Sequence, residues 1–201
     1  MLSISLYGSV YPSFTNNEIL HIEKKFGKEA YTRIYEYGEK IKTLKSDSEF
    51  IKLTKINIFL NHKLKYKSDK TLNNKSDYWA TPKEFLTIGS GDCEDYAIIK
   101  YFSLLKLGFK KDKLFITLVY DTFTKSSHMV LSYFESNNKA PLILDSLSYE
   151  ILNLDQRADL KVNAFINTNG VYKLTRTKKL KKTKLVSNKF KELLKRIDKE
   201  S

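Results

Sequence analysis

The first third of the chain places apolar residues at intervals of three and four, which is the spacing of one face of an α-helix. This spacing runs through residues 15–45, where polar residues 15–18 supply a start signal and Gly27 interrupts the pattern. It resumes over residues 47–65. We therefore predict a long helix that is broken near Gly27, followed by a second helix.

A polar stretch over residues 66–77 is predicted to be a loop, and helical signals return after it. Residues 81–84 read Thr-Pro-Lys-Glu, which combines an N-cap, a proline at the first helical position and an early glutamate. They predict a short helix that ends near Leu86. From Asp92 onward apolar residues again fall on one side, until Gly108 provides a stop signal. This segment is predicted to be the central helix of the fold.

Beyond Gly108 the pattern changes to short β-type runs that are separated by turn residues. The pair Asn169-Gly170 is typical of a tight hairpin turn. The predicted strands are residues 114–120, 128–134, 142–147, 164–167 and 171–174. Helices come first and an antiparallel sheet second, which indicates the α+β class.

The length and composition fit one globular domain. At 201 residues with 41% apolar residues, the chain is long enough for one well-buried core and short of what two full domains usually need. We place this domain at residues 14–174, between an N-terminal segment (1–13) and a basic C-terminal tail (175–201). Residues 1–10 lack a basic region and a small-residue cleavage site, so no intact signal peptide is evident. Either a signal has been removed or the protein is not exported.

The positive charge is concentrated in the tail. From Lys173 onward the sequence has twelve lysines and arginines but only three acids, which accounts for most of the net charge of +13. Such a block is typical of a solvated or disordered arm, or of a contact for an acidic partner or an anionic lipid. Four apolar residues at helical spacing suggest an amphipathic helix at its end, namely Phe190, Leu193, Leu194 and Ile197. No aromatic and basic residues alternate there, so we expect no nucleic-acid partner.

The chain has one cysteine, Cys93, and it stands at the predicted start of the central helix. There the unpaired backbone N–H groups and the helix dipole favour the thiolate, which is the reactive form. His128 begins one predicted strand, and Asp145 lies near the end of another. These residues outline a triad in which Cys93 attacks, His128 carries the proton and Asp145 fixes the tautomer of the imidazole.

Each of these residues also has an ordinary structural explanation. A single cysteine is more often a small buried hydrophobe, a single histidine is usually a surface or satisfied core group, and aspartates end many strands. A single cysteine also excludes an internal disulfide and a zinc or iron–sulfur site built on several cysteines. From composition alone the triad is therefore the less probable explanation of these three residues. The motifs around them decide between a catalytic and a structural role.

Four segments carry those motifs in a fixed order. They are residues 77–86 (DYWATPKEFL), 89–101 (GSGDCEDYAIIKY), 127–131 (SHMVL) and 144–147 (LDSL). The sequence resembles the LapG-type bacterial transglutaminase-like cysteine proteinases in these segments, and the resemblance extends over roughly residues 14–174. The cysteine motif is the most specific of the four. The N-terminus and the basic tail fall outside the resemblance.

The resemblance implies a papain-like fold in its transglutaminase-like form, with the cysteine at the N-terminus of a central helix that packs on an antiparallel sheet. It also implies a periplasmic protease that cuts a large repeat-containing adhesin near its N-terminus, at a small-residue site of di-alanine type, and so releases cells from a biofilm. An inner-membrane receptor that binds cyclic di-GMP is implied as its inhibitor. Membrane contact is expected only indirectly or through the basic tail.

Family members depend on Ca²⁺, and the acids beside the cysteine offer a physical reason. Asp92 and Glu94 flank Cys93, with Asp95 one residue further and Asp121 a weaker candidate from another segment. Nearby carboxylates raise the pKa of a thiol by like-charge repulsion, whereas a bound divalent cation reverses the local field. We therefore predict a calcium site on these acids. Alternatively, Asp92 caps the helix and the other two stabilise its first turn, and both roles can coexist.

An oxyanion hole needs two donors. The backbone N–H of Cys93 is the natural first donor, and the indole N–H of Trp79 is a candidate for the second, although tryptophan in this setting is more often a core or groove residue. His21 and His62 lie on predicted helices and are expected to be structural or surface residues.

Three classes of function remain open from the sequence. The leading hypothesis is a calcium-dependent cysteine endopeptidase. A transglutaminase or amidase uses the same acyl-enzyme, because water or an amine can resolve it. A non-catalytic binding module with a vestigial triad is the third, and the intact Cys93, His128 and Asp145 argue against it.

Overall fold

The structure is a computed structural model that describes residues 11–67, 78–136, 139–175 and 179–200. Its helices are α1 (Asn16–Phe26), α2 (Lys28–Leu44), α3 (Glu49–Lys63), α5 (Pro82–Ile88), α6 (Cys93–Lys106) and α7 (Asn188–Lys199), with a 3-10 turn η2 (Leu154–Gln156). Its strands are β1 (Lys65–Tyr66), β2 (Ser90–Gly91), β3 (Leu114–Asp121), β4 (Ser126–Tyr133), β5 (Leu142–Leu144), β6 (Leu152–Asn153), β7 (Leu160–Asn167), β8 (Gly170–Leu174) and β9 (Leu180–Lys182).

The helices confirm the periodicity of the sequence. Gly27, with a positive φ of 84°, separates α1 from α2 at the predicted break. The short helix α5 begins with the predicted capping box on Thr81 and runs slightly past Leu86, to a left-handed Gly89. Most of the predicted loop 66–77 lies outside the described residues. The α+β class is confirmed, because helices dominate the first half and strands the second.

The main sheet has seven antiparallel strands in the order β6-β5-β4-β3-β7-β8-β9. The predicted central strands are confirmed, whereas β6 and β9 were not predicted because each is only two or three residues long. The hairpin turn was misplaced by one residue, since Asn167 pairs with Gly170 and the turn itself is formed by Thr168 and Asn169. Gly170, which closes the turn, has a positive φ of 141°, which glycine adopts readily.

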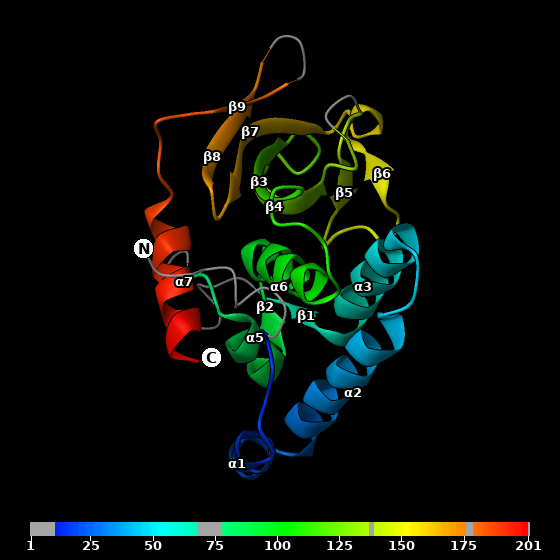
Figure 1. Cartoon of the computed structure of the whole chain (residues 1–201), viewed down its shortest axis with the longest axis vertical. Coiled ribbons are helices and arrows are strands. Elements are labelled where there is room, and N and C mark those ends of the chain that lie inside the picture. The colour runs from blue at the N-terminus through cyan, green and yellow to red at the C-terminus, as the bar shows by residue number, and fades with distance from the viewer. Residues whose placement is uncertain (1–10, 68–77, 137–138, 176–178, 201) are drawn as a thin grey trace.

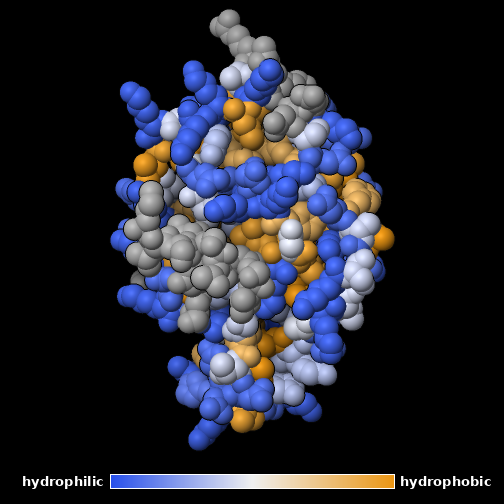
Figure 2. All heavy atoms as spheres, viewed as in Figure 1, coloured by the Kyte–Doolittle hydropathy of each residue, from blue (hydrophilic) through white to orange (hydrophobic). Residues whose placement is uncertain are grey.

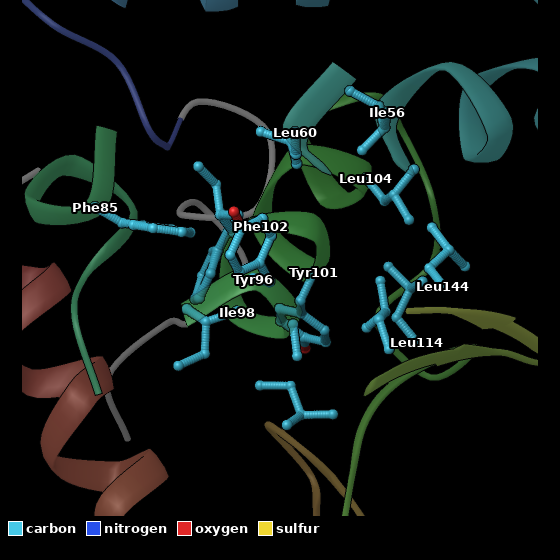
Figure 3. Packing of buried hydrophobic residues seen from close by; sticks show 14 of the residues in the cluster. Ile56, Leu60, Phe85, Tyr96, Ile98, Tyr101, Phe102, Leu104, Leu114 and Leu144 are labelled. Carbon is cyan, nitrogen blue, oxygen red and sulfur yellow. The ribbon is translucent and has the colours of Figure 1, made fainter. Parts of the chain in front are cut away.

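Helix α6 lies in the middle of the molecule, with the sheet on one side and α3, α5 and α7 around it (Figure 1). Its residues from Tyr96 to Leu104 are buried on every side. Figure 3 shows the packing that results, in which residues of α3, α5, β3 and the β5 end surround the helix. A helix buried all round cannot shift without opening the core, so the position of its first residue is fixed.

The face shown in Figure 2 is mostly hydrophilic, with hydrophobic groups gathered near its middle. Within the described ranges, no helix is long and apolar enough to cross a membrane.

The C-terminal helix α7 is part of the core. The predicted amphipathic helix is confirmed, and Phe190, Leu193 and Ile197 are buried in the same cluster as α6. The ring of Phe190 meets Tyr101 of α6 edge to face at 6.0 Å between centroids. The expectation of a solvated arm is therefore wrong for residues 188–199, because one apolar stripe is enough to dock a helix whose other faces carry the charge.

Replacing Phe190 by alanine tests whether α7 belongs to the folding unit. Phe190 is 3% exposed, and removing a buried aromatic ring leaves a cavity, so Phe190→Ala should lower the free energy of unfolding by about 3 kcal/mol. Urea titration followed by circular dichroism measures this loss. Leu185→Ala, at a position 60% exposed, is the control and should change it little. Equal stability of the Phe190→Ala protein and the parent would contradict the assignment.

Candidate active site

Cys93 is the first residue of α6, and local hydrogen bonds set that position. Asp92 is the N-cap, and its side chain accepts a hydrogen bond from the backbone N–H of Glu94 at 3.3 Å. The Asp95 carboxylate accepts in return from the N–H of Asp92 at 3.2 Å, which completes a capping box. The predicted capping role of Asp92 is confirmed, and the helix start places Cys93 at the positive end of the dipole.

Asp95 also ties α6 to the segment ahead of α5. Its second carboxylate oxygen accepts the backbone N–H of Ala80 at 2.7 Å. A Cβ on Gly91 would lie 2.2 Å from this carboxylate and 2.9 Å from the ring of Phe85, so only glycine fits there. Both carboxylate oxygens of Asp95 thereby accept from backbone N–H groups that precede the cysteine.

His128 and Asp145 form a buried pair. His128 lies on β4, and Asp145 follows β5, which is the strand next to β4 in the sheet. His128 Nε2 and Asp145 Oδ1 are 2.7 Å apart, and the two side chains are 6% and 0% exposed. This contact uses one ring nitrogen and leaves Nδ1 for proton exchange with another group. The structure therefore brings together the two residues that the sequence placed 17 positions apart.

The surroundings of Asp145 keep it ionised. Burial alone raises the pKa of Asp145, but the hydrogen bond and charge of His128, the backbone N–H of Leu147 at 3.0 Å and the Arg157 guanidinium at 2.9 Å together hold it well below its usual range. Arg157 also binds Asp159 at 2.7 Å, so two carboxylates share one cation. Arg157 was not singled out from the sequence, because nothing local marks it as a partner of Asp145.

Two asparagines of α3 hold the segment that carries Asp145. Asn61 Nδ2 donates to the carbonyl oxygens of Asp145 at 2.7 Å and Ser148 at 2.9 Å. Asn57 Nδ2 donates to the carbonyl oxygen of Ser148 at 2.8 Å. Both were missed from the sequence. The available signal was a pair of amides four residues apart on a helix whose neighbouring positions are apolar.

The thiol of Cys93 is buried, at 8% exposed, and it donates a hydrogen bond to Glu94 Oε2 at 2.9 Å. Burial raises the pKa of Cys93 well above its ordinary value, and the charges of Glu94 and Asp92 raise it further, while a backbone hydrogen bond from Met129 lowers it slightly. This direction is the one expected from the carboxylates that flank the thiol, and it opposes the effect of the helix dipole. Desolvation and two carboxylates outweigh the dipole.

Asp92, Cys93 and Glu94 form a cluster whose ligand atoms all lie within 4.8 Å of one another. The two carboxylates suit a hard cation, which prefers oxygen ligands, whereas a thiol does not. Among the residues that the structure describes, this cluster does not include the predicted Asp95 and Asp121. Asp95 instead accepts hydrogen bonds from the backbone N–H groups of Ala80 and Asp92. The Asp121 carboxylate accepts from the backbone N–H of Phe123 at 2.7 Å, in the turn between β3 and β4.

Trp79 lies in the same hydrophobic cluster as Cys93 and is 6% exposed. Its indole Nε1 is buried and has no hydrogen-bond partner within the described part of the chain. Its carbonyl oxygen accepts from the Arg196 guanidinium of α7, so the tail helix holds this segment. His21 and His62, which were expected to be structural or surface residues, are both exposed.

Comparison with known proteins identifies the family. The model of the bacterial transglutaminase-like cysteine proteinases matches residues 24–168. A calcium-bound structure of Legionella pneumophila LapG is 35% identical, with a TM-score of 0.78, and the alignment covers 92% of this chain and 99% of that one. An EGTA-treated structure of the same protein is 34% identical, with the same TM-score and coverage. No curated protein matches the chain.

These matches also assign the fold, which is that of the transglutaminase-like cysteine proteases. A protease of this kind needs a cysteine nucleophile, and Cys93 is the sole cysteine of the sequence. The chain thus belongs to the bacterial transglutaminase-like cysteine proteinase family.

Proposed function

We propose that this protein is a calcium-dependent cysteine endopeptidase that cleaves a large repeat-containing adhesin near its N-terminus. The observation that carries the proposal is the buried hydrogen bond between His128 and Asp145, on the strands beside the helix that begins with Cys93. A buried carboxylate that is hydrogen-bonded to an imidazole is the arrangement by which a third group orients the base of a catalytic triad.

The residues supply a complete acyl-transfer mechanism. Cys93 Sγ gives its proton to His128 Nδ1 and attacks the carbonyl carbon of the scissile peptide bond. His128 then passes this proton to the leaving amine, and the thioester that remains is hydrolysed by water with His128 as the base. Asp145 accepts the Nε2–H hydrogen bond throughout, which fixes the ring and stabilises the imidazolium.

The oxyanion of the tetrahedral intermediate requires donors near Cys93. We assign the first to the backbone N–H of Cys93 and the second to the Trp79 indole. The assignment of Trp79 is supported by a buried Nε1–H with no partner among the described residues, since a buried donor without a partner costs free energy that a functional role explains.

Calcium is proposed to bind Asp92 and Glu94. Legionella LapG has been described both calcium-bound and EGTA-treated, and the two carboxylates of this chain converge next to the nucleophile. A bound divalent cation supplies positive charge that offsets the repulsion between these acids and a thiolate. The residues fit this role because their side-chain oxygens are within 4.8 Å of each other and of Sγ.

The biological setting follows from the family resemblance of the motifs. We propose cleavage at a small-residue site of di-alanine type, in the periplasm, with release of cells from a biofilm as the outcome. An inner-membrane receptor that binds cyclic di-GMP is the proposed inhibitor. Acyl transfer to an amine instead of water, as in a transglutaminase or amidase, is the alternative use of the same acyl-enzyme.

Cleavage of a candidate adhesin N-terminal fragment tests the reaction class. Cys93→Ala should abolish cleavage, and His128→Ala should lower kcat/KM about 10³-fold or more, because the proton has no other carrier. His62→Ala, at an exposed histidine, is the matched control and should be fully active. Replacing the small residues at the cut site with leucine or arginine should stop cleavage.

Two outcomes of this assay would change the assignment. Incorporation of a labelled amine at the expense of hydrolysis would make the protein an acyltransferase. A fully active Cys93→Ala protein would rule out Cys93 as the nucleophile, provided that its circular dichroism spectrum matches that of the parent.

Chelation tests the metal. EGTA should abolish the protease activity, and added calcium should restore it. Calcium at a hundredfold excess over its Kd should stabilise the native state by about 2.7 kcal/mol. Asp92→Asn and Glu94→Gln should lose this stabilisation in a thermal melt, whereas Asp112→Asn, at an exposed acid, should keep it. Full activity after exhaustive EGTA treatment, with a melting temperature that calcium does not move, would leave the two acids as helix-capping residues only.

Alkylation of the single cysteine tests the electrostatics. Glu94→Gln removes the carboxylate that accepts from the thiol and repels the thiolate, so in EGTA the pKa of Cys93 should fall by about 1 or more. Iodoacetamide should then react at lower pH, as followed by mass spectrometry from pH 6 to 10. Glu39→Gln, an exposed acid on α2, is the control. An unchanged pH profile would mean that the Glu94 carboxylate does not act on the thiol.

A further inference from the structure

One peptide unit in the segment ahead of α5 is held at both of its polar groups. This unit joins Trp79 to Ala80. Its carbonyl oxygen accepts a hydrogen bond from the Arg196 guanidinium of α7, and its N–H donates to Asp95 Oδ1 at 2.7 Å. Because a peptide unit is planar, fixing its oxygen and its N–H fixes its orientation, and with it the backbone from which the Trp79 side chain leaves. We call these two contacts the peptide clamp.

Arg196 reaches this unit from the C-terminal helix, which lies beside α5 (Figure 1). Its Nη2 donates to the carbonyl oxygen of Trp79, while Nη1 donates to Glu84 Oε2 at 3.0 Å and to the hydroxyl of Tyr78. Its Cζ lies 4.6 Å from the centroid of the Tyr78 ring. A guanidinium binds several groups in fixed directions, which the ammonium of a lysine cannot do. Arg196 therefore ties the Trp79 carbonyl to the first turn of α5.

The ion pair of Arg196 and Glu84 adds little to stability. The two side chains are 31% and 38% exposed, and water largely screens an ion pair at such exposure. Helix α7 is docked instead by its buried apolar side chains, which are Phe190, Leu193 and Ile197. The contacts of Arg196 therefore determine where the Trp79 segment lies more than whether the helix docks.

The side chain that the peptide clamp orients is the indole of Trp79. It is 6% exposed, it lies in the same hydrophobic cluster as Cys93, and its Nε1 has no hydrogen-bond partner among the described residues. A donor of this kind can stabilise an oxyanion only if it is in place beforehand, because reorienting it during the reaction costs free energy. Asp95 follows Cys93 by two residues, so the clamp also sets the indole relative to the nucleophile.

We propose that Arg196 is a positioning residue of the active site, which holds the peptide between Trp79 and Ala80 so that the indole is in place to donate to the oxyanion. The proposal rests on the role of Trp79 in the proposed function. In this role Arg196 contacts neither the substrate nor Cys93, and it acts only through Trp79. The C-terminal helix thereby takes part in catalysis without lining the site.

Arg196→Met tests the proposal, because methionine keeps an aliphatic chain and removes the donors. The kcat for cleavage should fall about tenfold with KM unchanged, since an oxyanion donor acts in the transition state and not on the bound substrate. Trp79 is the single tryptophan of the chain, so its fluorescence reports on the clamp directly. Its emission should move to longer wavelength, and acrylamide should quench it more strongly. Lys195→Met, at the exposed neighbour on α7, is the matched control and should change neither quantity.

A double variant tests whether Arg196 acts through Trp79. Trp79→Phe removes the donor and should by itself lower kcat about 10²-fold. In that background Arg196→Met should lower kcat no further, because the two changes remove the same interaction. A loss in Arg196→Met that is equal with and without the indole would overturn the proposal. An unchanged kcat in Arg196→Met would overturn it as well.

Arg196→Lys keeps the charge but loses the planar fork, so it should show the same direction of fluorescence change and recover only part of the lost kcat. Failure of both Arg196 variants to fold, seen in their circular dichroism spectra, would also overturn the proposal, because Arg196 would then be a structural residue.

The fluorescence measurements need no substrate. A parent protein that does not cleave the adhesin fragment would therefore contradict the proposed substrate, while an altered emission in Arg196→Met would still sustain the peptide clamp. An emission that Arg196→Met leaves unchanged in an active protease would do the reverse.

Discussion

A buried carboxylate that must stay ionised organises the catalytic side of this protein. Asp145 is 0% exposed, and an isolated charge there would be very costly. Its oxygens are met by His128, by Arg157 and by the backbone of Leu147, and its own backbone is held by Asn61 from α3. Helix α3, the sheet and the segment after β5 therefore have to meet at one point. These contacts, together with the hydrophobic core, fix the segment that carries Asp145.

The nucleophile presents the opposite problem, since its immediate neighbours disfavour its reactive form. Asp92 and Asp95 form the capping box that begins α6 at Cys93, and Glu94 accepts a hydrogen bond from the thiol. Asp92 thus helps to position Cys93 and, together with burial and Glu94, raises its pKa. A cation bound between Asp92 and Glu94 would relieve this conflict, which makes a metal requirement a natural means of control. Helix capping and metal binding are compatible here because Asp92 uses one carboxylate oxygen, Oδ1, for the cap, and Glu94 takes no part in the capping box.

The C-terminal helix links the tail of the chain to the site. Its apolar stripe packs against α6, and Arg196 contacts both Glu84 at 3.0 Å and the carbonyl oxygen of Trp79. From Trp79 the chain continues to Ala80, whose N–H binds Asp95 in the first turn of α6. A continuous set of contacts therefore connects residues 188–199 to the nucleophile. A charge count alone assigned this segment to solvent, whereas the burial of three side chains assigns it to the core.

The sequence by itself determined the order of the elements, the helix start at Asp92 and the placing of Cys93, because capping and hydrophobic periodicity are local properties that neighbouring residues set. It also indicated His128 and Asp145, through motifs rather than through geometry. Only the tertiary structure decided that Arg157 and Asn61 converge on Asp145, and that the thiol of Cys93 is buried. These features depend on burial and on contacts between residues tens of positions apart, and neither is encoded in any short stretch of the chain.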